Sequence, residues 1–275
     1  MVVDQTLPEV QPGWAVGLSV SQSEDLARYG VTDTHVNMAL AEIARAVLIA
    51  DSRLIYGGHL DNDGYTVFLT REIQRFGRRN RPFTGYVPFP VHRKMRTDKI
   101  ADRIEDLSVL GTYVFLNETG DEIDPVVNRG PRPVRVSKSL ERKALTAARE
   151  TMARNIDARI ALGGQRHGYK GRLPGVIEET TYAIRDRKPV FIAGGFGGVA
   201  ADMAVALGID RDNWLNVDPT VPYLDELNAT AAAAGWTPGS NGLTDEENQR
   251  LAITYRASEV ASLIVTGLSR LNRTP

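Results

Sequence analysis

The feature that most constrains the fold is a regular alternation of short apolar runs with longer stretches of helical periodicity. The apolar runs predict strands at 14–20, 53–56, 83–89, 112–116, 158–162 and 189–193. Strands that alternate with helical segments form βαβ units around a parallel sheet. We therefore expect an α/β protein, with three layers made of a parallel sheet and the helices that flank it.

The same pattern divides the chain into regions. We expect an N-terminal arm, a ligand-binding domain and a helical C-terminal extension over 1–12, 13–210 and 211–275. Within the domain, residues 118–137 contain three prolines and no clear period, which indicates an insertion. In the extension, helical spacing predicts helices over 222–234 and 244–271.

Composition limits both the chemistry and the compartment. The 275 residues have a net charge of −1 and no cysteine, which excludes disulfides, thiolate metal sites and a cysteine nucleophile. The histidines lack the spacing of a zinc motif, and the first strand is not followed by GxGxxG. We expect no metal and no cofactor. The N-terminus has no apolar signal core, and no apolar run could span a bilayer, so we expect a cytoplasmic protein without a membrane partner.

Glycines end three of the six predicted strands, at Gly57-Gly58, Gly163-Gly164 and Gly194-Gly195, with Gly197 close behind. Ligands of open parallel sheets bind beyond the carboxyl ends of the strands. Glycine lets the backbone approach a ligand there, and the next helix offers unpaired N–H groups. We therefore expect these glycines to belong to a phosphate or ribose site.

Hydroxyl side chains follow two of the strands. Ser19 and Ser21 lie at the end of the first, and Thr66 lies near the start of the helix after Gly57-Gly58. Each can donate a hydrogen bond to a phosphate oxygen, although serine also caps helices. We expect these three residues to contact the ligand.

The loop after the strand at 158–162 contains the most chemistry. Its cations are Arg166, Lys170 and Arg172, a set suited to clamping phosphate. Gly175 then opens a helix with Glu178 and Glu179 in its first turn, where carboxylates also stabilise the helix dipole. Neighbours on a helix diverge by about 100°, so at most one of the two carboxylates should face the ligand.

This region resembles the SLOG superfamily. The resemblance is carried by Met152 to Gly164, by Pro174 to Glu179, and by the glycine-rich end of the following strand, Gly194 to Gly198. The superfamily groups cytokinin-activating phosphoribohydrolases, the DNA-processing protein Smf/DprA and nucleotide-sensing domains. The chain looks closest to the sensors joined to Sir2 or TIR modules in antiphage systems. The resemblance implies a Rossmann-like nucleotide-binding domain.

In the phosphoribohydrolase branch, a glutamate and an arginine act on an N-glycosidic bond, while glycines and a threonine hold phosphate. By resemblance, Glu179 and Arg149 are the catalytic candidates if the protein is an enzyme. The glycines of the motif correspond to Gly163, Gly164 and Gly175. Val176 replaces the threonine, and the loop is longer than in that branch. Valine cannot donate to phosphate, so both departures favour a sensor.

The resemblance thus implies a domain that binds ADP-ribose or cyclic ADP-ribose, with Tyr169 or Phe196 stacking on the base. A sensor without its own effector would need a separate effector protein or self-assembly, and we expect a homo-oligomer. The alternative is an N-glycoside hydrolase that acts on a nucleotide. DNA binding is the weakest alternative, because the chain is neutral and basic side chains cluster only at 75–81 and 93–96.

Overall fold

A computed structural model describes residues 13–58, 64–77, 81–127, 134–218 and 220–271. The expected N-terminal arm, 1–12, and part of the expected insertion, 128–133, lie outside the described residues. Among those described, no helix has both the length and the apolar character needed to cross a membrane.

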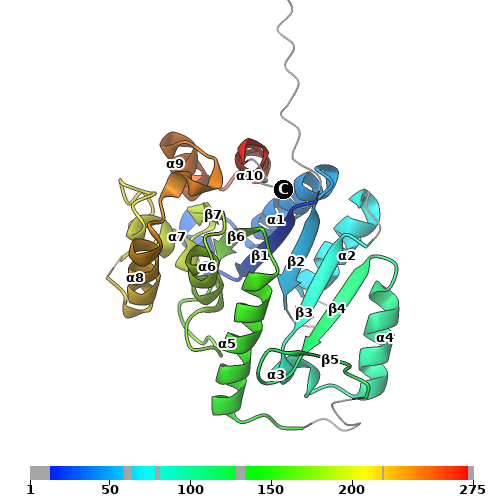
Figure 1. Cartoon of the computed structure of the whole chain (residues 1–275). Helices are drawn as coiled ribbons and strands as arrows, with labels where there is room; N and C mark the ends of the chain where they lie inside the picture. Colours follow the sequence, from blue (N-terminus) through cyan, green and yellow to red (C-terminus); the bar gives the residue numbers. More distant parts are fainter. Residues whose placement is uncertain (1–12, 59–63, 78–80, 128–133, 219, 272–275) are drawn as a thin grey trace, which may run out of the picture.

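The centre of the molecule is a single seven-stranded sheet (Figure 1). Its strands are β1 (Ala15–Ser21), β2 (Arg53–Gly57), β3 (Phe83–Val87), β4 (Gly111–Leu116), β5 (Glu122–Ile123), β6 (Ala158–Gly163) and β7 (Val190–Ala193). They lie in the order β5-β4-β3-β2-β1-β6-β7, and only the pairing of β4 with β5 is antiparallel. The expected α/β class is confirmed. The order reverses at β1, which pairs with β2 on one side and β6 on the other.

Helices cover both faces of the sheet (Figure 1). They are α1 (Asp33–Ile49), α2 (Tyr65–Phe76), α3 (Phe89–His92), α4 (Thr97–Leu107), α5 (Lys138–Arg154), α6 (Gly175–Arg185), α7 (Gly198–Ala206), α8 (Asp225–Ala234), α9 (Asp245–Ile253) and α10 (Ala257–Arg270). Four short 3-10 turns are η1 (Leu26–Tyr29), η2 (Gly194–Phe196), η3 (Pro222–Leu224) and η4 (Pro238–Asn241).

The two faces are built by the alternation of side chains along the strands. In β1, Val16 and Leu18 join a core with α1, α2 and α10, whereas Ala15 points to the core under α5 and α6. In β6, Ile160 points to the first core and Ala161 to the second. Residues of odd number near the ends of β1 and β6 therefore face α5 and α6.

The structure corrects the sequence analysis in several elements. Helix α3 begins inside the strand expected at 83–89, and β5 lies inside the expected insertion; neither was predicted. Helix α4 was also not predicted, although its Ile100, Ile104 and Leu107 recur at helical spacing; of these three, only Ile100 and Leu107 are buried. The long helix expected at 244–271 is divided into α9 and α10. Thr254 lies in extended backbone at the break, and its hydroxyl accepts from the backbone N–H of Arg256.

The C-terminal helices pack against the sheet and its helices. Helix α10 packs on α1, and its Val260 and Ile264 belong to the same core as Leu40. Helix α8 packs on α6, while α9 packs on β7 and η2. The extension therefore covers one edge of the sheet, and the division of domains at residue 210 stays a prediction.

Candidate ligand-binding site

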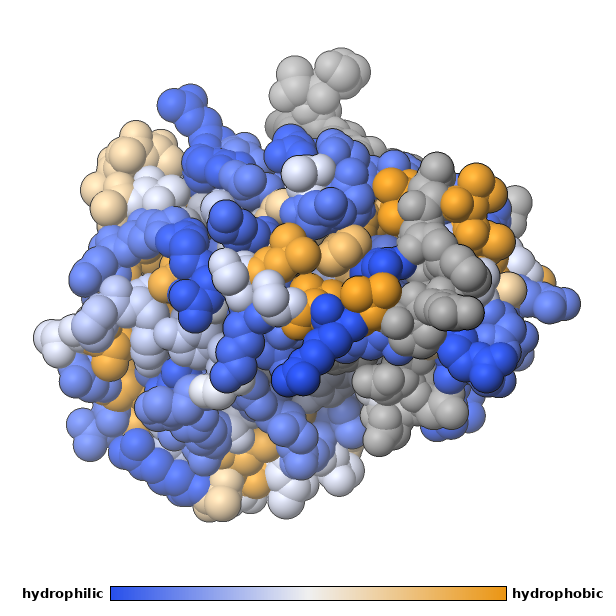
Figure 2. All heavy atoms as spheres, turned by 90° about the horizontal axis from the view of Figure 1, so that it is seen from below, coloured by the Kyte–Doolittle hydropathy of each residue, from blue (hydrophilic) through white to orange (hydrophobic). Residues whose placement is uncertain are grey.

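A cavity of about 580 Å³ lies at the carboxyl ends of β1, β2, β3 and β6. This position is next to the reversal of strand order, where open parallel sheets bind ligands. Its volume lies within the range of about 300–1,000 Å³ typical of small-molecule sites. The polar and aromatic side chains that line it are Ser19, Ser21, Gln22, Tyr56, Tyr65, Tyr86, Arg149, Gln165, Tyr169, Lys170 and Glu179. Most of the face onto which the strands point is hydrophilic, with hydrophobic side chains gathered near its centre (Figure 2).

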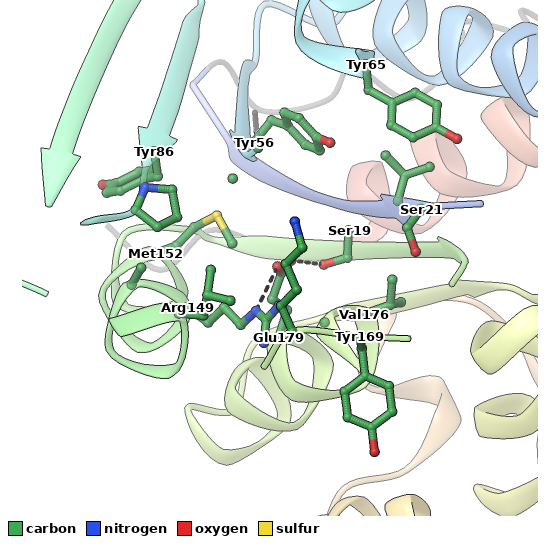
Figure 3. A pocket seen from close by; sticks show the side chains of 18 of the residues that line it. Ser19, Ser21, Tyr56, Tyr65, Tyr86, Arg149, Met152, Tyr169, Val176 and Glu179 are labelled. Atoms are coloured by element: carbon green, nitrogen blue, oxygen red, sulfur yellow. Dashed lines mark hydrogen bonds and ion pairs between the residues drawn. The ribbon is translucent and has the colours of Figure 1, made fainter. Parts of the chain in front are cut away.

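Ser19 and Glu179 form the polar floor of the cavity. The Ser19 hydroxyl donates to Oε2 of Glu179, as the dashed line in Figure 3 shows. Arg159, which is fully buried on β6, donates from Nη1 to Ser19 Oγ at 3.1 Å and to Glu179 Oε2 at 3.2 Å. The proton of Ser19 is therefore directed to Glu179, whereas the sequence analysis directed it to phosphate.

Arg149 reaches the cavity from α5 and lies beside Glu179. Its Nε is 3.7 Å from Oε1 of Glu179 (Figure 3), and its Nη1 donates to Glu178. The guanidinium crosses the start of α6 because two glycines leave room for it. A Cβ on Gly175 would lie 2.7 Å from Nη2 of Arg149, and one on Gly171 would overlap Nη1. The Pro-Gly sequence at the start of α6 thus has a packing role, which lets an arginine pair with both carboxylates.

Glu178 turns away from the cavity and is fully buried. Its Oε1 accepts from Thr146 Oγ1 at 2.7 Å and from the Tyr182 hydroxyl at 3.3 Å, and it lies 3.5 Å from Nε of Arg172. Only Glu179 of the pair lines the cavity, as the angle between helical neighbours requires. Glu178 therefore organises the wall behind the site.

Two of the three expected phosphate clamps are held in ion pairs outside the cavity lining. Arg166 lies 2.7 Å from Asp25 and donates to both oxygens of Asp202 at 2.7 and 2.8 Å. Arg172 pairs with both oxygens of Glu226 on α8, and these hydrogen bonds raise the pKa of Arg172. These arginines fasten the loop to η1, α7 and α8.

Lys170 is the third expected clamp, and it does line the cavity. Within the part of the chain that the structure describes, it forms no ion pair, whereas Arg149, Arg166 and Arg172 each have a carboxylate partner. A cation without an internal partner can pair with an anionic ligand at the smallest cost. Lys170 is thus the lining residue best suited to contact a phosphate.

Three tyrosines line the cavity from neighbouring elements. Tyr56 lies on β2, Tyr65 opens α2 and Tyr86 lies on β3. Burial raises the pKa of each phenol, most strongly for Tyr56, so all three stay protonated at neutral pH and can donate hydrogen bonds. Tyr169 adds a fourth ring from the loop before α6 and is 38% exposed (Figure 3). Such rings can stack on a base or cover a ribose.

The predicted glycines divide into two groups. Gly57, Gly58 and Gly175 line the cavity, together with the predicted Ser21. The other predicted glycines lie outside its lining, and so does Thr66. These glycines are Gly163, Gly164, Gly194, Gly195 and Gly197. Sequence cannot separate the two groups, because close packing and ligand approach both require a missing side chain.

The glycines outside the lining are explained by packing and turns. Gly163 and Gly164 have φ of 64° and 105°, which only glycine adopts without strain, and they turn the chain after β6. A Cβ on Gly194 would lie 2.5 Å from the carbonyl oxygen of Ala252 on α9. The N-terminus of α7 is also occupied, since Gly198 N–H donates to Asp25 at 2.8 Å. An internal carboxylate thus takes the position where the sequence analysis expected phosphate.

The basic side chains considered for nucleic acid binding are partly neutralised. Within the described residues, the pairs are Arg75 with Glu72, Lys94 with Glu141 and Arg96 with Asp98. Residues 78–80 of the basic stretch lie outside the described part of the chain. These contacts reduce the positive charge that Arg75, Lys94 and Arg96 offer to a phosphate backbone.

Sequence reasoning missed Arg159 and three lining tyrosines, Tyr56 on β2, Tyr86 on β3 and Tyr65 at the start of α2. Arg159 did leave a signal, because it is a single charged residue inside the apolar run at 158–162. Tyr56 and Tyr86 left no signal, since aromatic residues are common in strands.

A parallel sheet with a cavity beside its reversal of strand order is the architecture of nucleotide-binding α/β proteins. The family model of SLOG cluster2 matches residues 11–251, and the chain belongs to this family. No curated protein matches the chain significantly. Membership confirms the resemblance to SLOG proteins and implies a nucleotide-binding, sensor-like domain; kinship with the Sir2- and TIR-associated branch stays a prediction.

Proposed function

We propose that the cavity binds a nucleotide-derived ligand with phosphate groups, of the ADP-ribose or cyclic ADP-ribose type, and that the protein acts as a sensor of this ligand. The observation that carries the proposal is the lining of the cavity. It combines Lys170, a cation that forms no ion pair with any described residue, with a carboxylate, Glu179, and four tyrosine rings. Phosphate, ribose hydroxyls and a base are the groups that these side chains bind.

Two further features support binding over catalysis. Val176 lines the cavity at the first turn of α6, where the hydrolase branch that the sequence resembles has a phosphate-holding threonine. Glu179 also has both oxygens next to arginines, with Arg159 at Oε2 and Arg149 at Oε1. A carboxylate held in this way is a hydrogen-bond acceptor, which suits recognition of hydroxyl groups.

An N-glycoside hydrolase is the second candidate, and one observation favours it. Arg149 and Glu179, the pair that resemblance assigns to glycosidic cleavage, both line the cavity and lie 3.7 Å apart. In such a reaction, a carboxylate stabilises the positive charge that develops on the sugar. Because the pair is present, the test of function must include a search for products.

The experiment is a titration of the purified protein with ADP-ribose, cyclic ADP-ribose, NAD and AMP, followed by chromatography of each mixture. We expect ADP-ribose-type ligands to bind in the micromolar range and to be recovered unchanged. Glu179→Gln should weaken binding by about 10–100-fold. The matched control is Glu150→Gln, an exposed carboxylate on α5 that pairs with Arg185. Release of base that Glu179→Gln abolishes would establish the hydrolase instead, and absence of binding by all four ligands would refute the sensor proposal.

The response of a sensor requires an output. We propose either a separate effector protein or self-assembly into a homo-oligomer. The ion pairs of Arg166 and Arg172 support coupling of the site to the C-terminal helices, because they join the cavity loop to α7 and α8. Sedimentation with and without ADP-ribose would show whether assembly changes; identical profiles would favour a separate effector.

A further inference from the structure

We infer that Arg159 is a positioning residue that orients the Glu179 carboxylate so that its Oε1 accepts a hydrogen bond from a ribose hydroxyl of the ligand. The site would therefore discriminate the hydroxylated nucleotide from a deoxy analogue. This inference rests on the proposed function and extends it. It proposes that Glu179 binds a ribose of the ligand, and that Arg159, which lies behind the cavity, controls this contact.

The burial of Arg159 is the first argument. Its side chain lies on β6 with no solvent exposure, and it points to the side of the sheet covered by α5 and α6. Room for the guanidinium comes from Gly17 on β1, since a Cβ there would lie 3.0 Å from Cζ and Nη1 of Arg159. Gly17 is buried within a strand, where glycine is otherwise unfavourable. The missing side chain leaves room for two neighbours, Ile156, whose Cγ2 would lie 2.9 Å from the Cβ, and the Arg159 guanidinium.

Stability alone does not account for a buried arginine. Removing a charge from water is costly, and apolar residues of the same volume often serve a core as well or better. Burial lowers the pKa of Arg159, and the Glu179 carboxylate opposes this change. Among the described residues, Nε and Nη2 of Arg159 have no hydrogen-bond partner. The polar contacts of this cation are thus concentrated at one nitrogen, Nη1.

The contacts of that nitrogen are both with the cavity floor. Nη1 donates to Ser19 Oγ at 3.1 Å and to Glu179 Oε2 at 3.2 Å, while the Ser19 hydroxyl donates to the same Oε2. Two donors on Oε2 fix the orientation of the carboxylate. Oε1 then lies 3.7 Å from Nε of Arg149, which is too far for a hydrogen bond. Oε1 can therefore accept from a ligand.

A ribose hydroxyl is the group that fits Oε1. A phosphate would be repelled by the carboxylate, whereas a hydroxyl donates to it, and hydrogen bonds to charged groups are the stronger class. A site built to bind a hydroxyl rejects the analogue that lacks it, because its own polar group is then left without a partner. Without Arg159, Oε2 loses one of its two donors and the carboxylate can turn towards Arg149.

The test is calorimetric titration with ADP-ribose and with two analogues, each lacking the hydroxyls of one ribose. In the wild-type protein, we expect one analogue to bind about 10–100-fold more weakly than ADP-ribose. In Arg159→Met and Arg159→Lys, the affinity for ADP-ribose should exceed that for this analogue by less than about threefold, while the affinity for the analogue stays nearly constant. Arg53→Met is the matched control, an exposed arginine on β2. Equal weakening of ADP-ribose and the analogue would mean a structural role only and would overturn the inference.

A second measurement needs no ligand. Thermal unfolding of Arg159→Met, Glu179→Gln and the double variant forms a double-mutant cycle. Arg159→Met should lower the Tm by about 6–20 °C, because it leaves a carboxylate near the core without its partner, and the double variant should recover part of this loss. Additive losses would overturn the inference, and if Arg159→Met does not fold, Arg159→Lys takes its place in the cycle. If the wild-type protein binds none of the probes, the proposed function fails, while the cycle still decides whether Arg159 and Glu179 act together.

Discussion

Replacing Gly194 with alanine should destabilise the protein, because the end of α9 packs directly on this glycine. An ideal Cβ on Gly194 would lie 2.5 Å from the carbonyl oxygen of Ala252 and 3.3 Å from Cα of Ala201. Both neighbours are backbone atoms, so a side chain cannot relieve the overlap by rotating. Either η2 or the carboxyl end of α9 must move.

The expected cost is that of overpacking a core, about 1–3 kcal/mol. For a chain of this size, each kcal/mol lowers the Tm by about 2–4 °C, so Gly194→Ala should lower it by about 2–12 °C. Gly239→Ala is the matched control, since a Cβ there meets no atom within 4 Å. Removing a glycine without a clash stabilises by about 0.4–1 kcal/mol. The control should therefore keep or slightly raise the Tm.

Differential scanning calorimetry measures the Tm of both variants, and a titration with ADP-ribose measures their affinity for the ligand. Gly194 lies outside the cavity lining, so the affinity of the folded Gly194→Ala protein should stay within about threefold of wild type. A wild-type Tm combined with lost affinity would refute the packing explanation and would indicate that the glycine loop at 194–198 contacts the ligand.

Three further changes test the site and its support. Lys170→Gln should weaken ADP-ribose binding by about 1–2 kcal/mol, or about 5–30-fold, and the loss should shrink as salt is added; equal effects of Lys143→Gln, an exposed lysine on α5, would contradict a specific contact. The hydrogen bond from Arg172 lowers the pKa of Glu226 below its ordinary value of 4.5. The stability from this pair is thus present above that value and lost as the pH falls through the folded-state pKa. The Tm gap between wild type and Glu226→Gln is worth at most about 1 kcal/mol at pH 7 for exposed groups. It should shrink steadily as the pH is lowered below 4.5, and a gap independent of pH would exclude the pair as its cause. Val176→Thr adds a donor at the first turn of α6 and should tighten AMP binding by about 2–10-fold in calorimetry; unchanged or weaker binding would show that phosphate does not reach this turn.

The residues of the cavity differ in how far sequence could predict them. Glu179 was predictable, because it lies in a motif at the start of a helix that follows a strand, and the carboxyl ends of parallel strands share one edge of the sheet. Lys170 was predictable only as one of three cations. Its distinction from Arg166 and Arg172 depends on Asp202 and Glu226, which are 36 and 54 residues away in the chain.

The sequence alone determined the features that depend on local order. The period of apolar residues defines strands and helices, and it places the glycine-ended loops and the Pro-Gly-Val-Ile-Glu-Glu motif at the ligand edge of the sheet. These features are local because a strand or helix repeats every two or 3.6 residues.

The tertiary structure decided which of these groups remain available to a ligand. Packing neutralised two of the three loop cations, filled the N-terminus of α7 with Asp25, and directed the proton of Ser19 to Glu179. It also brought Arg159 under the cavity floor, beside Gly17 of β1. Charge pairing and steric fit act between residues that are distant in sequence, and no local pattern contains them.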